Sequence, residues 1–266
     1  MISIIKWTIW QRRWSIMWWS IAVVGFILIN LVFYPTFKDQ AAELDKSLSQ
    51  LPESAKALFA GSGDFASPVG YLNSQIFFLM LPMLLTILTI GLGSSIVAKE
   101  EREGTVELLL ARPVSRNKLL ISKSLAAIVI LILVSTLAFI TTAITVKLVD
   151  LIVPLRYIAA ATFSSVILAM CFGAIAFVIT ILSKTSKTAS IGIATFIAFG
   201  GYIISSLSTT VDWLKTPSKF FPAYYYKPES ILHGNIEWQY LLFPISIIVV
   251  SAIVSWWSFN RRDIGN

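Results

Sequence analysis

Six stretches of the chain contain no Asp, Glu, Lys or Arg and are each long enough to cross a lipid bilayer. A spanning helix needs about 20 apolar residues, because each residue advances about 1.5 Å through about 30 Å of hydrocarbon. The stretches are Trp14 to Phe37, Phe65 to Ala98, Ser124 to Val146, Tyr157 to Ser183, Thr188 to Val211 and Trp238 to Asn260. Each is predicted to be helical, since lipid offers no partner for a free backbone N–H or C=O and the alternation of a membrane barrel is missing.

The predicted fold class is therefore an all-α polytopic membrane protein with six transmembrane helices. We expect one transmembrane domain over residues 1–266, with spans at about 14–36, 74–98, 120–146, 157–182, 189–211 and 239–259. Within the spans, Pro82 and Pro244 predict kinks, because proline lacks the N–H that a helix interior needs. Scattered Gly, Ser and Thr residues favour close helix packing, and lining a pathway is the alternative.

The N-terminal segment, residues 1–13, begins an aromatic stripe. Trp7, Trp10, Trp14 and Trp18 recur at spacings of three, four and four, with basic residues elsewhere on the helix. This pattern is typical of a helix that lies in the membrane interface. We expect an interfacial elbow helix that bends into the first span, and a plain extension of that span is equally compatible with the pattern.

Two segments between spans carry their own patterns. Residues 38–64 place apolar side chains at spacings of three and four, interrupted by Pro52, which predicts extracytoplasmic amphipathic helices meeting near Leu51. These helices are expected to cap the bundle, with a substrate gate as the alternative. Residues 212–237 are rich in Phe, Tyr and Pro and predict either an interfacial aromatic belt or a hydrophobic vestibule.

The distribution of positive charge predicts the orientation. Thirteen of the 21 Lys and Arg residues flank the spans on the side of the two termini and of the second and fourth loops; the other side has eight, accompanied by nine acids. The positive-inside rule places both termini in the cytoplasm. We expect a multi-pass protein of the plasma (inner) membrane. The net charge of +7 is explained by these flanks and implies no nucleic acid partner.

Several chemistries find no support in the residues. Cys171 is the single cysteine and His233 the single histidine, so we expect neither a disulfide nor a His/Cys metal site. The sequence contains no Gly-Lys dipeptide, so the phosphate-binding loop GxxxxGK[ST] is missing and the chain is not expected to be an ATPase enzyme. The spans also lack the carboxylates that ion-coupled secondary transporters hold within the membrane.

The loop of residues 99–118 is the part of the chain richest in polar signals, with eight charged residues in its first eighteen positions. Gly104 ends the preceding helix, Thr105 is placed to cap a new one, and Glu107 lies in its first turn, where a carboxylate interacts favourably with the helix dipole. Leu108–Leu110 give that short helix an apolar face. The face could lie in the interface or fit a groove on a soluble partner.

The run AKEEREGTVELLLARPVSRNKLL, residues 98–120, resembles the signature E-E-x-x-G-T-x-E-x-L-L-x-x-P-[IV]-S-R of ABC-2 type transporter permeases. The resemblance implies two permease chains in the membrane and a coupling helix in this loop that docks on a separately encoded ATP-binding subunit. ATP and Mg would then belong to that subunit, with no cofactor in this chain. The predicted docking residues are Glu100, Glu101, Gly104, Thr105, Glu107, Leu108, Leu109, Arg112, Pro113 and Arg116.

The resemblance thus implies a permease subunit that forms the translocation path of an ATP-driven exporter, as a homodimer in the lipid bilayer. Other readings stay open. A membrane anchor or sensor that does not itself transport would share the fold. A secondary transporter would require carboxylates within the spans, and this chain has none there. A CAAX-type intramembrane protease would require an arginine where Thr105 stands and histidines in later spans. The transported substrate is not predicted, because the pattern alone does not separate path-lining from lipid-facing residues.

Overall fold

The computed structural model describes the chain except for residues 41–45, 47–49, 60–66, 96–115, 183–186 and 262–266. Among the described residues six helical segments are long and apolar enough to cross a membrane, which confirms the predicted number of spans. They are Arg13–Lys38, Pro68–Gly93, Asn117–Leu148, Leu155–Leu182, Thr188–Leu207 and Trp238–Arg261. The described part contains helices, turns and bends and no strand, in agreement with the predicted all-α class.

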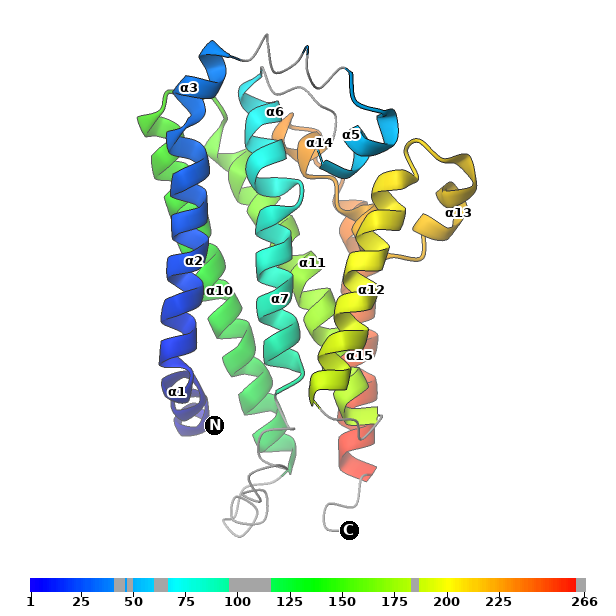
Figure 1. Cartoon of the computed structure of the whole chain (residues 1–266). Coiled ribbons are helices and arrows are strands. Elements are labelled where there is room, and N and C mark those ends of the chain that lie inside the picture. The colour runs from blue at the N-terminus through cyan, green and yellow to red at the C-terminus, as the bar shows by residue number, and fades with distance from the viewer. Residues whose placement is uncertain (41–45, 47–49, 60–66, 96–115, 183–186, 262–266) are drawn as a thin grey trace.

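The long helices run side by side and form a bundle (Figure 1). They are α2 (Arg13–Val32), α7 (Met80–Gly93), α10 (Arg116–Leu148), α11 (Leu155–Leu182), α12 (Lys187–Leu207) and α15 (Leu242–Arg261), and the shorter α1 (Ile2–Gln11) lies at the foot of α2. The short elements are α3 (Tyr34–Asp39), α5 (Glu53–Phe59), α6 (Pro68–Leu72), η1 (Asn73–Phe77), η2 (Asp212–Leu214), α13 (Lys215–Ser218), η3 (Pro222–Tyr225), α14 (Pro228–Leu232) and η4 (Trp238–Leu241). Figure 1 places α1 and the end of α15 at one end of the bundle and α3, α5, α6, α13 and α14 at the other, the cap end.

Prolines divide three of the spans at their cap ends. In the second span, η1 is a π-helix, the backbone leaves helical geometry at Leu79 (φ −131°), and Pro82 follows in the first turn of α7. A proline is tolerated there because the first N–H groups of a helix have no internal partner. The predicted kink at Pro82 therefore exists as a break three residues earlier.

The prediction that Pro244 kinks the interior of the sixth span was wrong, because this proline lies at the start of a helix. Pro244 is the third residue of α15 and directly follows the 3₁₀ turn η4. It therefore lies at the start of a helix, where its missing N–H leaves no hydrogen bond unmade. Pro35 similarly lies in the first turn of α3, after the first span breaks at Phe33.

The elbow segment is a helix of its own. The backbone breaks at Arg12, between α1 and α2, so residues 1–13 are not a plain continuation of the first span. α1 packs chiefly against α10. The side chains of Trp7, Trp10, Trp14 and Trp18 are all more than half exposed, as anchoring residues at a membrane surface require. The location of α1 in the interface stays a prediction.

α11 is the central helix of the bundle. It packs against α7 more extensively than any other pair of elements, and also against α15, α12, α10 and α14. Gly93 of α7 lies directly on the carbonyl of Gly173 of α11, and a Cβ at Gly173 would meet the Thr89 Cβ at 2.8 Å. Thr89 Oγ1 donates a hydrogen bond of 2.6 Å to the carbonyl of Ala169. Two helices approach this closely only where side chains are small.

This close approach predicts opposite effects for two glycines of the same helix. Gly93→Ala would drive a methyl group into the backbone of α11 and should lower stability by about 1–3 kcal/mol, the usual range for an overpacked contact. Gly91→Ala has open space around its Cβ and should be neutral or stabilising by up to about 1 kcal/mol. Apparent melting temperatures of the purified variants in one detergent would measure both, and equal values for the two would contradict the assignment of this contact.

Candidate functional site

The predicted docking residues fall almost entirely outside the described part of the chain. Nine of the ten, from Glu100 to Pro113, lie in residues 96–115, and Arg116 is the first residue of α10. Their role in docking therefore stays a prediction. The structure does describe the two helices that flank this loop, α7 on one side and α10 on the other. They pack against each other, so the loop leaves and re-enters the bundle between neighbours.

An arginine from the elbow holds the end of α7. Arg12 Nη2 donates a hydrogen bond of 2.5 Å to Ser95 Oγ, two residues beyond the end of that helix. Burial lowers the pKa of Arg12 from its ordinary value. A positive charge at the C-terminal end of a helix interacts favourably with the helix dipole. The bond links α1 and α2 to the helix from which the predicted coupling loop departs, and no spacing in the sequence relates residues 12 and 95.

A cavity of about 1160 Å³ opens between α7, α11 and α12 and extends toward the cap end. Its walls along the spans are mostly apolar and include Leu79, Met83, Ile87, Ile90, Leu168, Phe172, Ala198 and Phe199. Nearer the cap end they include Asn73, Tyr202 and Ser205, and the rim carries Lys215, Lys219, Lys227, Glu229 and His233. The cavity therefore grades from an apolar interior to a charged opening.

The aromatic segment, residues 212–237, contacts the second span beside its break. Tyr226 Oη donates a hydrogen bond of 2.7 Å to the carbonyl of Phe77, the last residue of η1, and lies 2.8 Å from Ser165 Oγ of α11. Burial raises the pKa of Tyr226, so its hydroxyl stays protonated well above neutral pH. Tyr224 and Tyr226 both line the cavity, as the vestibule interpretation predicts, whereas Trp213 and Phe220 are about three-quarters exposed, as in a belt.

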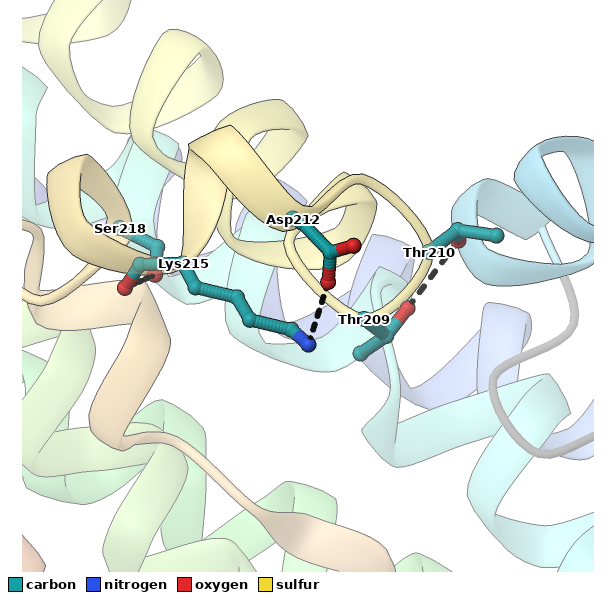
Figure 2. Close-up of polar contacts among 5 residues, drawn as sticks. All are labelled: Thr209, Thr210, Asp212, Lys215 and Ser218. Carbon is teal, nitrogen blue, oxygen red and sulfur yellow. Dashed lines mark hydrogen bonds and ion pairs between the residues drawn. The ribbon is translucent and has the colours of Figure 1, made fainter.

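Lys215 on the rim of the cavity forms an exposed ion pair. Figure 2 shows the Lys215 side chain extended toward Asp212, and its Nζ lies 2.7 Å from Asp212 Oδ1. The hydrogen bond and charge of Lys215 lower the pKa of the Asp212 carboxyl, which is fully exposed. In the same view the hydroxyls of Thr209 and Thr210 lie 3.4 Å apart, and Ser218 donates to the Lys215 carbonyl at 3.0 Å. Such a surface pair adds little stability, but it neutralises one rim lysine.

The described residues contain no group of three or more His, Cys, Asp or Glu side chains placed to hold a metal ion. Cys171 is a buried free thiol inside α11. The candidate sites in the described structure thus lie at opposite ends of the bundle: the Arg12–Ser95 hydrogen bond at one end and the cavity at the other.

Comparison with known proteins identifies the family. Residues 3–264 match the family described as "ABC-2 family transporter protein". The chain belongs to the ABC-2 transporter family. Proteins of this family are membrane components of transport, are not themselves catalytic and normally work with an ATP-binding subunit. The match spans nearly the whole chain, so the resemblance noted for residues 98–120 extends to all six spans.

A curated relative has little functional information to add. The "Uncharacterized membrane protein YdbK" of Bacillus subtilis (strain 168) is 25% identical over 233 residues, covering 79% of this chain and 88% of the relative. No solved structure matches the chain.

In this ABC-2 protein, Arg12 is predicted to couple the elbow to α7. Arg12→Ala and Ser95→Ala should each lower stability, and the double variant should lose less than the sum, with a coupling of about 1–2 kcal/mol for a hydrogen bond to a charged group. Arg13→Ala is the matched control, because that guanidinium is exposed over the Trp10 ring at 4.0 Å. Apparent melting temperatures of the four variants would test this, and strictly additive losses would rule out the coupling.

Tyr226 is predicted to hold the aromatic segment in place. Tyr226→Phe keeps the ring but removes the donor to the Phe77 carbonyl, and should cost about 1–2 kcal/mol because a buried acceptor loses its partner. Tyr225→Phe should have little effect, since its ring stacks on Phe243 and its hydroxyl has no partner among the described residues. Limited proteolysis of residues 212–237 would report the difference, with faster cleavage expected only in Tyr226→Phe.

Proposed function

We propose that this ABC-2 protein is the membrane-spanning permease subunit of an ATP-driven ABC transporter, that it works as an exporter, and that it couples to a separate ATP-binding subunit through the loop of residues 99–116. The observation that carries the proposal is the family match over residues 3–264. The resemblance of residues 98–120 to the permease signature supports this loop as the docking element. ATP and Mg would be held by the partner, in keeping with the lack of a phosphate-binding loop in this sequence.

The packing of the bundle supports a mechanism in which the loop acts as a lever. Its flanking helices, α7 and α10, contact each other, and α7 also forms the largest helix contact with the central α11. A force applied to the loop would reach α7 and α10 first and then α11. Because helices packed to this density do not deform continuously, we expect displacement of whole helices. ATP binding and substrate binding must favour different arrangements of the bundle for this coupling to operate.

The orientation and assembly complete the proposal. The end of the bundle that carries α1 and the end of α15 faces the cytoplasm, as the excess of Lys and Arg on that side favours. The cavity then lies toward the outer side, where we place part of the translocation path. A second copy of the chain is required, because one six-span chain without an internal repeat offers one coupling loop, whereas ATP-binding subunits act in pairs. The plasma membrane is the expected location.

The docking proposal predicts that Glu107→Ala together with Leu109→Ala uncouples transport from ATP hydrolysis. The leucine would leave an apolar pocket on the partner, and the carboxylate would lose its charge partner. The prediction takes both as anchor residues of the interface, whose truncation costs more than about 1 kcal/mol each. The complex, isolated from native membranes in mild detergent, should contain a P-loop ATPase in equal stoichiometry. In the double variant we expect the ATPase to be lost or to hydrolyse ATP without supporting export.

A matched control removes the same two residue types from the other end of the bundle. Leu148→Ala with Glu237→Ala changes a leucine that is 76% exposed and an exposed acid, both far along the chain from the loop. This control should retain the ATPase and its coupling. Unchanged recovery and export in the Glu107 and Leu109 variant would overturn the docking proposal, and isolation of the chain without any ATPase would favour the membrane anchor or partner-free transporter instead.

A further inference from the structure

Two buried polar atoms without a partner line the same cavity. Asn73 is 1% exposed, and its Oδ1 atom finds no hydrogen-bond donor in the described part of the chain. Ser205 is half-buried, and its Oγ atom is likewise buried and unpaired among the described residues. Four such atoms occur among the described residues, and the other two, on Asn117 and Ser255, do not line the cavity. An unpaired buried polar group costs about 1–3 kcal/mol, so two in one cavity call for a ligand.

The neighbouring polar groups are satisfied within the protein, which makes Asn73 an exception. Ser74 donates to the Tyr71 carbonyl at 3.1 Å, and Thr89 donates to Ala169 across the helix contact. Asn73 is the first residue of the π-helix η1, and its backbone carbonyl accepts from Phe78 N at 2.7 Å. π-helical turns occur often at functional sites. The backbone of Asn73 is therefore paired, and its side-chain oxygen is a buried acceptor without a partner in a residue that lines the cavity.

The size and the apolar walls of the cavity indicate what kind of ligand fits it. A volume of about 1160 Å³ exceeds the range of about 300–1,000 Å³ typical of small-molecule sites. From the level of Asn73 the cavity continues beside Met83, Ile87 and Ile90 of α7 and beside Phe172 of α11. These walls offer apolar contact over about two turns of helix. A flexible hydrocarbon chain fits this space better than a compact polar solute does.

The lysines on the rim of the cavity indicate the charge of the part of the ligand that lies at the opening. Lys215 is paired with Asp212, and Lys56 with Glu53 at 3.0 Å. Lys219 is exposed at the rim and has no ion-pair partner among the residues described. Lys227 lies 4.5 Å above the Tyr240 ring, a contact that leaves its positive charge uncompensated. Among the described rim residues, Lys219 and Lys227 then stand against one acid, Glu229, so the opening retains a small excess of positive charge and attracts an anion.

We infer that the cavity binds an anionic amphiphile whose polar head donates a hydrogen bond from N–H or O–H to Asn73 Oδ1. Its hydrocarbon chain lies between α7, α11 and α12, and its anionic group faces Lys219 and Lys227. Ser205 offers a second polar contact from α12. The inference rests on the proposed function in that it makes this amphiphile the class of the exported substrate. The binding itself requires no ATPase, so its failure is distinguishable from failure to recover the ATP-binding partner.

Two probes differ in the donor alone. N-dodecanoylglycine carries a carboxylate, an apolar chain and an amide N–H, and N-dodecanoylsarcosine replaces that hydrogen with a methyl group. Equilibrium binding of each radiolabelled probe would be measured on the full chain in nanodiscs of zwitterionic phosphatidylcholine, with empty nanodiscs subtracted. The wild-type chain should prefer the glycine probe by about five- to tenfold, which is the effect expected of one hydrogen bond.

The variants separate the site from general partitioning into lipid. Asn73→Leu has a similar shape without an acceptor, and should bind both probes with equal affinity while losing no thermal stability. Ser205→Ala gives a second measurement should Asn73→Leu fold poorly, and should reduce the preference about twofold. Ser255→Ala, which removes an unpaired hydroxyl outside the cavity, should keep the full preference. Lys219→Gln should weaken both probes about equally and reduce the dependence of binding on salt.

Repeating the measurement with phosphatidylglycerol in the nanodiscs identifies the source of the ligand. This lipid is anionic and has hydroxyl donors in its head group. Competition with the glycine probe in the wild type, but not in Asn73→Leu, would assign the site to a membrane lipid, and unchanged binding would assign it to an amphiphile from outside the bilayer. Equal affinity of the wild type for the two probes, or a preference that survives in Asn73→Leu and Ser205→Ala, would overturn the inference.

Discussion

The contact between α7 and α11 determines how the rest of the bundle is arranged, because the two backbones touch where Gly93 meets Gly173. In a membrane, apolar burial gives helices no reason to prefer one another over lipid, so close packing of small residues and hydrogen bonds between helices must supply the association. Thr89 provides such a bond to Ala169 beside the glycines. With these two helices fixed, α11 is free to pack against α15, α12, α10 and α14 on its remaining sides.

The second span links both functional ends of the molecule. At one end its helix α7 finishes at Gly93, and Ser95 receives Arg12 before the chain enters the predicted coupling loop. At the other end the same span is interrupted at Leu79, and Tyr226 holds the carbonyl of Phe77. A rigid segment of 14 residues therefore lies between a tethered end and an interrupted one. Any motion imposed at the loop would reach the cavity along this segment, since its residues line the wall.

The sequence predicts the spans well because lipid restricts what a chain can do: an uncharged stretch of 20 residues has few structures available other than a helix. The break in the second span could be anticipated from Pro82, but not its position, which depends on the π-helix before it. The prediction of a kink at Pro244 was wrong because, within a hydrophobic stretch, the sequence does not distinguish a proline at the start of a helix from a proline inside one. Arg12 and Tyr226 were missed as site residues, because their hydrogen-bond partners lie 83 and 149 residues away in the chain. Asn73 was missed because its place on the cavity wall and its unpaired side-chain oxygen are visible only in the folded structure. The predicted docking residues 100–113 lie beyond the described part.

The six charge-free stretches form the interiors of the spans; among the basic residues of the long helices, Lys118 and Lys123 lie in the first two turns of α10, and Lys147 and Arg261 lie at helix ends. This has an electrical consequence. Moving one elementary charge through a membrane potential changes the free energy by about 2.3 kcal/mol per 100 mV. Helices that carry no charge within the hydrocarbon can tilt or slide past one another without moving charge across that field. In the proposed rearrangement, the charge-free interiors of the helices therefore carry no charge of their own across that field.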